Sequence, residues 1–179
     1  MLAACGAPAP AAPVAPACGD VVIGDQADVA RAAGCVALRS LTIRSGAALD
    51  LAPLAGLREV TGDVVVGPTV GMEDLSLTGL RTVGGALRVV GNGLAQGIFL
   101  RQLERAGAIT IDGNPAITTI ALPRLTTAAA LRVTDNASLE LLDLAALTTL
   151  GAALVVTGAP RLSVLDAPGL PDDQRAALP

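Results

Sequence analysis

Asp143 and Asp166 are the residues whose types and spacing come nearest to a catalytic pair. They occupy the same place in two successive repeats of the chain, so we expect their carboxylates to lie within about 5–6 Å of each other. A carboxylate pair at that distance does acid–base chemistry or holds Ca²⁺. Aligned acids on an outward-facing column are more often solvated surface, so we assign no catalytic, cofactor-binding or metal-binding residue.

The composition excludes most other chemistry. The chain has 179 residues, of which 52% are hydrophobic and 16% are charged, a formal net charge of −4, no His, Tyr or Trp, and a single Phe at position 99. Without His, and with the cysteines otherwise committed, no nucleophile–base pair forms, and we predict that the protein is not an enzyme. The missing basic block argues against nucleic acid. We expect no cofactor and no small-molecule ligand.

The positions of leucine show that the chain repeats. A Leu follows a turn at intervals of 22 or 23 residues, and 22 residues before the first of them stands Cys35. A period in the low twenties indicates a solenoid in which each coil is one supersecondary unit. We therefore expect about six coils between residues 35 and 170. The repeating leucines are Leu57, Leu80, Leu103, Leu125, Leu147 and Leu170.

Each coil contains a short strand with one buried face. The outer two residues of a triplet are apolar and the middle one varies, which is the period-two pattern of a half-buried strand. Three residues after three of these strands stand Asn92, Asn114 and Asn136, in Gly-Asn or Asp-Asn pairs that suit a turn with positive φ. Spaced one coil apart, their amides are expected to form a hydrogen-bonded ladder. The triplets are Leu41–Ile43, Val64–Val66, Leu87–Val89, Ile109–Ile111, Leu131–Val133 and Leu154–Val156, and the end coils carry Gly46, Thr69 and Ala159 in place of the Asn.

A second apolar pair in each coil predicts another strand on the return side. Between this pair and the next repeating Leu only two residues fit, and they include Pro123 and Pro168. Because proline disrupts a helix interior, we expect strands and tight corners, and hence an all-β parallel β-helix, or β-solenoid. An ordinary leucine-rich-repeat horseshoe is the alternative. It is disfavoured because Gly84 stands three residues before Leu87, where that signature has an apolar residue.

The two ends of such a solenoid need caps, because an open ladder pairs with other chains. At the N-terminal end, residues 25–33 read as a short helix with Asp25 as N-cap and Val29 facing the first coil. At the other end, residues 171–179 contain proline and charged residues, which are expected to end the stack of strands. The repeat domain is thus expected over residues 18–179, after a separate segment of residues 1–17.

The three cysteines suggest a location. Cys18 and Cys35 fit a disulfide in an oxidising compartment, with two buried free thiols as the alternative. Cys5 ends Leu2-Ala3-Ala4-Cys5, which resembles the lipobox of bacterial lipoproteins, where the Cys is acylated. An ordinary flexible terminus with a free thiol is the alternative. Residues 6–17 are almost wholly Ala and Pro and read as a semi-rigid tether. Only Met1 precedes Leu2, so the charged and apolar parts of a signal peptide are expected upstream of it.

The repeat also resembles a known family. The elements Cys18, Gly34-Cys35 and Leu41-Thr42-Ile43, followed by repeats such as residues 80–92, look like the receptor L domain of the leucine-rich-repeat superfamily. The resemblance covers residues 18–170. It implies a right-handed parallel β-helix with an N-terminal helix stapled by a cysteine pair. The long loops, extra cysteines and aromatic residues of the hormone receptors are absent, and no hormone-binding motif matches, so no binding residue is carried over.

These features lead to an expected function without an expected ligand. We expect a non-enzymatic lipoprotein of the bacterial cell envelope, anchored to the outer membrane or extracellular, that presents a rigid face for protein recognition or scaffolding. Membrane contact is expected only through the lipid. The candidate contact residues are Arg88, Thr110 and Arg132, which share one column, and Phe99, which strict alternation points outward although local core filling is equally compatible. The alternatives are a structural or adhesive spacer and, more remotely, a polysaccharide-active β-helix enzyme.

Overall fold

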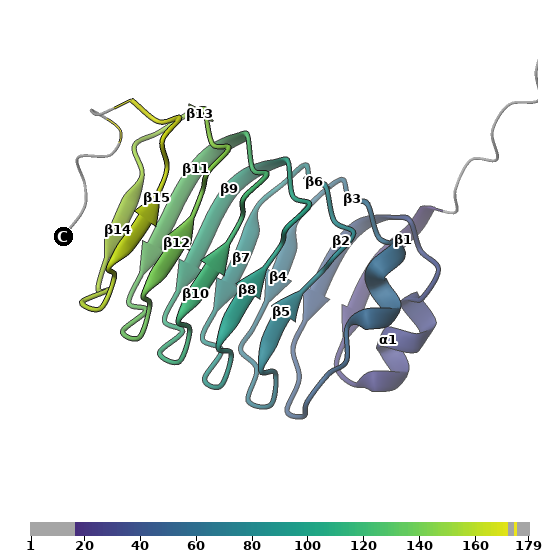
Figure 1. Ribbon diagram of the computed structural model, residues 1–179. Helices are drawn as coiled ribbons and strands as arrows, with labels where there is room; N and C mark the ends of the chain where they lie inside the picture. The colour runs from purple at the N-terminus through teal and green to yellow at the C-terminus, as the bar shows by residue number, and fades with distance from the viewer. Residues whose placement is uncertain (1–16, 172–173, 175–179) are drawn as a thin grey trace, which may run out of the picture.

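Short parallel strands stack into two sheets, one coil of the chain above another (Figure 1). The computed structural model describes residues 17–171 and residue 174, and it shows a mostly-β solenoid of about seven turns. The ten-stranded sheet contains β1 (Ala17–Ile23), β2 (Ala37–Ile43), β3 (Glu59–Val60), β4 (Val64–Val66), β6 (Thr82–Val83), β7 (Leu87–Val90), β9 (Arg105–Asp112), β11 (Thr127–Thr134), β13 (Thr149–Leu150) and β14 (Val155–Thr157). The five-stranded sheet contains β5 (Asp74–Ser76), β8 (Gly97–Phe99), β10 (Thr119–Ala121), β12 (Leu141–Asp143) and β15 (Val164–Asp166).

One face of each strand points into the solenoid because apolar residues alternate along it. In the pair β9 and β11, Ile109 lies beside Leu131 and Ile111 beside Val133, and all four side chains are at most 1% exposed. The return strands supply a second fully buried column, which consists of Leu75, Ile98, Ile120 and Leu142. Two thin aliphatic columns meet in one core, which explains how the chain folds with a single aromatic residue.

The solenoid begins earlier than residue 35, where the first coil was expected. Strand β1 pairs in parallel with β2, with Val21 beside Leu41 and Ile23 beside Ile43, and this adds a turn to the six predicted coils. The alternation is visible in the burial, since Ile23 is fully buried and Val22 is 65% exposed. The sequence pattern missed this strand because its first half is Ala-Cys-Gly-Asp, which has no alternating large apolar residues and contains Gly and Asp, two residues typical of turns.

Helix α1 (Gln26–Ala32) follows β1 and lies within the predicted range of residues 25–33. Asp25 is its N-cap: its side chain accepts a hydrogen bond from the Asp28 N–H at 3.0 Å, and the Asp28 carboxylate accepts one from the Asp25 N–H at 3.3 Å. This reciprocal pair is a capping box. Val29 and Ala32 are buried against the first coils. Of the predicted C-terminal stop at residues 171–179, only Pro171 and Gln174 lie within the described residues.

The return side is built from strands and tight corners except in the coil of residues 35–57, which we call the first coil. The turn that β1 and α1 form before it is called the first turn. Residues Ala52–Gly56 form a 3-10 helix, η1, where no helix was predicted. Pro53 is compatible with this because it stands in the first turn, where its missing N–H has no helical partner. Leu54 points into the core and is 2% exposed. The five-stranded sheet therefore begins only with β5 in the second coil.

A residue with positive φ precedes each ladder asparagine, as the Gly-Asn and Asp-Asn pairs predict. Gly91 has φ 68°, Gly113 has φ 62° and Asp135 has φ 52°. This conformation turns the chain sharply at the end of β7, β9 and β11 and directs the next side chain inward. Gly158 has the same conformation, with φ 65°, before Ala159. The corner is thus retained in the last coil even though the Asn is not.

Gly107, in β9, is expected to tolerate no side chain, because a Cβ there would lie 2.3 Å from the carbonyl oxygen of Gly85 in the preceding coil. The Gly107 N–H donates to that same oxygen at 3.0 Å, so the strand must shift and weaken this bond. We expect Gly107→Ala to lower the free energy of unfolding by about 2 kcal/mol. The matched control is Gly93→Ala, where a Cβ meets nothing within 4 Å. Equal stability of the two variants in urea unfolding would contradict the close approach.

Candidate functional site

The three ladder asparagines form a continuous buried network. The Asn92 amide nitrogen donates to Asn114 Oδ1 at 2.9 Å, and the Asn114 amide nitrogen donates to Asn136 Oδ1 at 3.1 Å. The same two oxygens also accept the backbone N–H groups of Asn92 and Asn114. All three side chains are 0% exposed. The ladder therefore satisfies polar groups inside the corner and offers no surface to a ligand.

The network continues toward the N-terminal end with hydroxyl side chains. Thr69 Oγ1 donates to Asn92 Oδ1 at 2.8 Å. In the coil before it, Ser45 is buried and Gly46 is exposed. Ser45 therefore occupies the buried position that the alignment of the repeats assigned to Gly46. The Ser45 hydroxyl instead closes a local turn with the backbone of Ala47. The asparagine ladder is thus limited to the central coils.

Cys18 and Cys35 form a disulfide, with their Cα atoms 5.8 Å apart. Of the two alternatives from the sequence, the structure therefore has the disulfide and not two buried free thiols. The bond joins β1 to the segment that follows α1, so it closes the first turn of the solenoid. Cys5, the predicted lipidation site, and residues 6–16 of the predicted tether lie outside the described residues, and Ala17, the last residue assigned to the tether, begins β1 instead.

The four candidate contact residues do not lie on one surface. Arg88, Thr110 and Arg132 are neighbours in successive strands β7, β9 and β11 on the outer face of the ten-stranded sheet. Phe99 lies in β8 of the five-stranded sheet. Alternation along a strand indicates whether a side chain points outward, but it does not indicate which sheet carries it. The structure therefore separates Phe99 from the arginine column.

Phe99 is half-buried and lies outside the core. Its strand neighbours Ile98 and Leu100 are fully buried, so its ring points away from them. The ring lies across Gly97, where an added Cβ would meet it at 2.3 Å. The Arg101 guanidinium stands over the ring at 5.4 Å from its centroid, within cation–π range. Phe99 therefore faces outward, covers the backbone of Gly97 and contacts the guanidinium of Arg101.

The predicted acidic pair lies on adjacent strands. Asp143 in β12 and Asp166 in β15 are register partners. Asp143 Oδ1 accepts a hydrogen bond from the Ala145 N–H at 3.1 Å, which is a local turn contact. Within residues 17–171 and residue 174, no group of three or more His, Cys, Asp or Glu side chains is placed to hold a metal ion. The pair gives no reason to assign catalysis.

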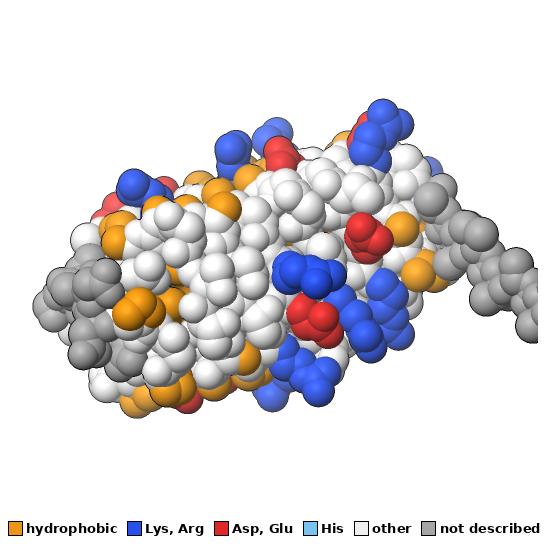
Figure 2. All heavy atoms as spheres, turned by 90° about the horizontal axis from the view of Figure 1, so that it is seen from above, with side chains coloured by type: hydrophobic (Ala, Val, Ile, Leu, Met, Phe, Trp, Pro, Cys, Tyr) orange, Lys and Arg blue, Asp and Glu red, His pale blue; other side chains and the backbone are white. Residues whose placement is uncertain are grey.

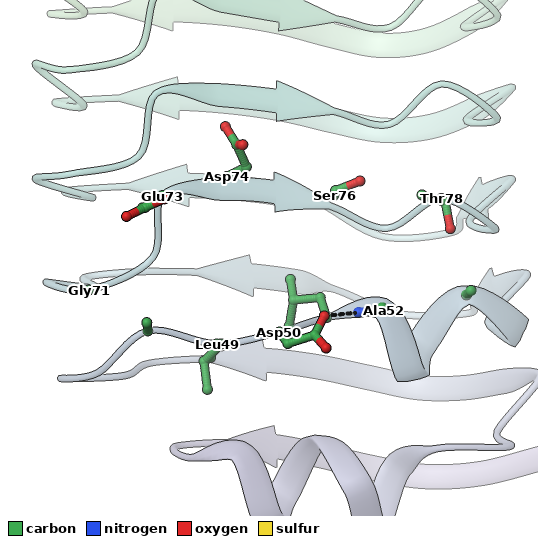
Figure 3. A pocket seen from close by; sticks show the side chains of 11 residues that line it. Leu49, Asp50, Ala52, Gly71, Glu73, Asp74, Ser76 and Thr78 are labelled. Carbon is green, nitrogen blue, oxygen red and sulfur yellow. Dashed lines mark hydrogen bonds between the residues drawn. The ribbon is translucent and has the colours of Figure 1, made fainter.

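A slot of about 470 Å³ opens between the return segments of the first two coils (Figure 3). Asp50 of the first coil and Glu73 and Asp74 of the second line it with carboxylates, beside Ser76 and Thr78. The slot exists because η1 replaces a strand in the first coil, which leaves one edge of β5 without a neighbouring strand. Asp50 Oδ1 accepts from the Ala52 N–H at 2.9 Å, so this carboxylate stabilises its own turn.

The corner that joins the five-stranded sheet to the ten-stranded sheet carries a basic surface that the sequence reading did not single out. Arginine side chains gather with a few acidic ones over the N-terminal part of this face, and the rest of it is mostly uncharged (Figure 2). We call this surface the arginine edge. It consists of Arg58, Arg81, Arg101, Arg105 and Arg124, all exposed. The signal was present as arginines at intervals close to the repeat length.

Comparisons with known proteins identify no relative. No protein-family model, curated protein or solved structure matches the chain. The fold and the surfaces described above are therefore the basis for any function. In the described part of the chain, no helix is long and apolar enough to cross a membrane.

Proposed function

We propose that this chain is a non-enzymatic lipoprotein of the bacterial cell envelope or surface, where it presents a rigid face for protein recognition or scaffolding. The observation that carries the proposal is the disulfide between Cys18 and Cys35. Disulfides persist in oxidising compartments outside the bacterial cytoplasm and are rare inside it. This bond leaves Cys5 as the odd cysteine, at the end of the lipobox-like segment Leu2–Cys5.

The finer fold assignment belongs to the same proposal. We place the solenoid with the right-handed, receptor L-domain-like β-helices, with α1 as its N-terminal cap. Two contacts support the cap: Val29 is fully buried, and the Gln26 side-chain amide exchanges two hydrogen bonds with the backbone of Asp50, at 2.8 and 2.9 Å. A side-chain amide paired in this way with the first return segment occupies backbone groups that another chain would otherwise pair with.

A recognition role agrees with the rigidity of the solenoid. The core columns and the asparagine ladder hold successive coils in register, so outward side chains keep fixed positions relative to one another. Such a surface binds with little loss of backbone entropy. The alternative role of a structural spacer is favoured by the same stiff core. It is distinguished from recognition by whether any surface substitution changes the binding of a partner.

Metabolic labelling with palmitate tests the anchor. The charged and apolar regions of a host lipoprotein signal peptide are fused ahead of Leu2, and wild type is compared with Cys5→Ala in a bacterial host. We expect label in the wild-type protein and in the membrane fraction, and at least about tenfold less in the variant, because stable anchoring needs the lipid chains. Gly93→Ala is the control, since its added Cβ meets nothing within 4 Å, it keeps Cys5 and the disulfide, and it is expected to leave labelling intact. Label that is unchanged in Cys5→Ala contradicts the anchor.

A further inference from the structure

We infer that the arginine edge is the docking surface for a protein partner that presents a row of carboxylates. The inference rests on the proposed recognition function and names its surface and the chemistry of its partner. The edge carries five arginines and two glutamates, Glu59 and Glu104, which gives a local charge of +3. The whole chain has a formal charge of −4. Positive charge is thus concentrated on one corner of an acidic protein.

The corner backbone sets the spacing of these charges. The Arg81 N–H donates to the Arg58 carbonyl at 2.8 Å, and the Glu104 and Arg105 N–H groups donate to the Arg81 carbonyl at 2.8 and 3.2 Å. Equivalent positions in successive coils are about 4.8 Å apart. Arg58 and Arg81 therefore stand one above the other, Glu104 takes the equivalent place in the next coil, and Arg105 follows it as the register partner of Thr82. The like charges of Arg58 and Arg81 disfavour folding slightly, and an acidic partner relieves that cost.

The edge arginines are not neutralised within the chain. The ion pairs found among the described residues join Arg31 to Asp28 and Arg39 to Asp20, both away from the edge. Arg58 donates to the Gly79 carbonyl at 3.2 Å and Arg124 to Gln102 Oε1 at 2.7 Å, which orients these two guanidinium groups without cancelling their charge. Arg81, Arg101 and Arg105 are exposed residues. Guanidinium groups bind carboxylates through two parallel hydrogen bonds, so they suit this partner chemistry.

The shape and composition of the edge favour a protein over a small acid. The side chains project from the outside of a corner (Figure 2), which offers a wide contact rather than an enclosed site. Beside the edge, the ring of Phe99 lies under Arg101. Arginine and aromatic residues are enriched in protein interfaces, whereas lysine is depleted. All twelve basic residues of the chain are arginine.

The first test measures binding of poly-L-glutamate, used as a model row of carboxylates. Wild type is compared with Arg58→Gln/Arg81→Gln/Arg105→Gln and with a control of equal net charge, Arg88→Gln/Arg132→Gln/Arg161→Gln. We expect the edge variant to bind at least about tenfold more weakly and the control to change by less than about twofold, with affinity falling as salt increases. Equal weakening of both variants, or no binding by wild type, overturns the inference. Dextran sulfate or duplex DNA that binds the edge tenfold more tightly than poly-L-glutamate also overturns it.

The second test uses the anchored protein in its native envelope, with a photoreactive amino acid at Thr126, an exposed position on the same corner. We expect crosslinks to a protein whose crosslinked peptides are rich in Asp and Glu, in wild type and in the control variant but not in the edge variant. A partner captured equally by the edge variant overturns the arginine edge and leaves the proposed function intact. Capture of no partner by any form overturns both. Far-UV circular dichroism of each variant checks that it is folded.

Discussion

Replacing Asn114 by Ala is expected to lower the free energy of unfolding by about 4 kcal/mol. Asn114 is fully buried in the middle of the ladder. Its Oδ1 accepts from the backbone and side chain of Asn92, and its amide nitrogen donates to the carbonyl of Val89 at 3.0 Å. The substitution leaves these groups buried without partners, and each such group costs about 1–3 kcal/mol. Urea unfolding followed by far-UV circular dichroism measures the loss, because the chain has no Trp or Tyr for fluorescence.

Two further variants test whether the loss of stability comes from the lost hydrogen bonds of Asn114 or from its lost side-chain volume. Thr110→Ala changes an outward side chain in the same strand and is expected to cost less than about 1 kcal/mol. Asn114→Asp keeps the size of the side chain. It replaces the amide nitrogen, which donates to the Val89 and Asp112 carbonyls, by a carboxyl oxygen. Burial beside these oxygens raises the pKa of the introduced carboxyl in the folded protein. Stability is therefore retained at low pH, where the carboxyl is protonated, and lost as pH rises through the folded-state pKa. An Asn114→Ala protein within 1 kcal/mol of wild type contradicts the argument.

The repeating parts of the fold were predictable because each depends on a local pattern that recurs. Alternating apolar residues specify a strand with one buried face, and Gly-Asn pairs specify a corner with positive φ. The period then places Asn92 above Asn114 without any knowledge of the chain path. Asp25 as a helix N-cap is equally local, since it needs only Asp28 three residues later.

The parts that sequence reasoning missed depend on how coils are joined. Strand β1 has few alternating apolar residues and is held by β2 and the disulfide, which are contacts distant in sequence. Phe99 and Arg88 were grouped because both point outward, but they lie on different sheets. The repeat spacing relates Arg58 to Arg81, but it does not show that these positions lie on the same exposed corner as Arg101 and Arg124. Which side chains share one exposed corner is therefore known only from the structure.

Removing the disulfide is expected to free the first turn of the solenoid and leave the central coils folded. The bond closes a loop with a sequence separation of 17, and a closure of this size stabilises by about 3 kcal/mol in the chain-entropy model. Strand β1 is at the end of its sheet and pairs with β2 alone among the described strands. Because each unit of a solenoid contacts mainly its neighbours, the loss remains at that end. Hydrogen exchange of Cys18→Ala/Cys35→Ala is therefore expected to show faster exchange in β1 and α1 and unchanged protection in β9 and β11.

Cys5→Ala is the control for that experiment, since it removes a thiol without opening the first turn. Reduction of the wild-type disulfide is expected to reproduce the double variant, and protection of β1 that survives both treatments contradicts the argument. The consequence reaches function. Once β1 separates, the edge of β2 is exposed, and an exposed strand edge pairs with other chains. A protein folded under reducing conditions is therefore expected to aggregate at its N-terminal end, so the solenoid depends on an oxidising compartment for its first turn as well as for its proposed location.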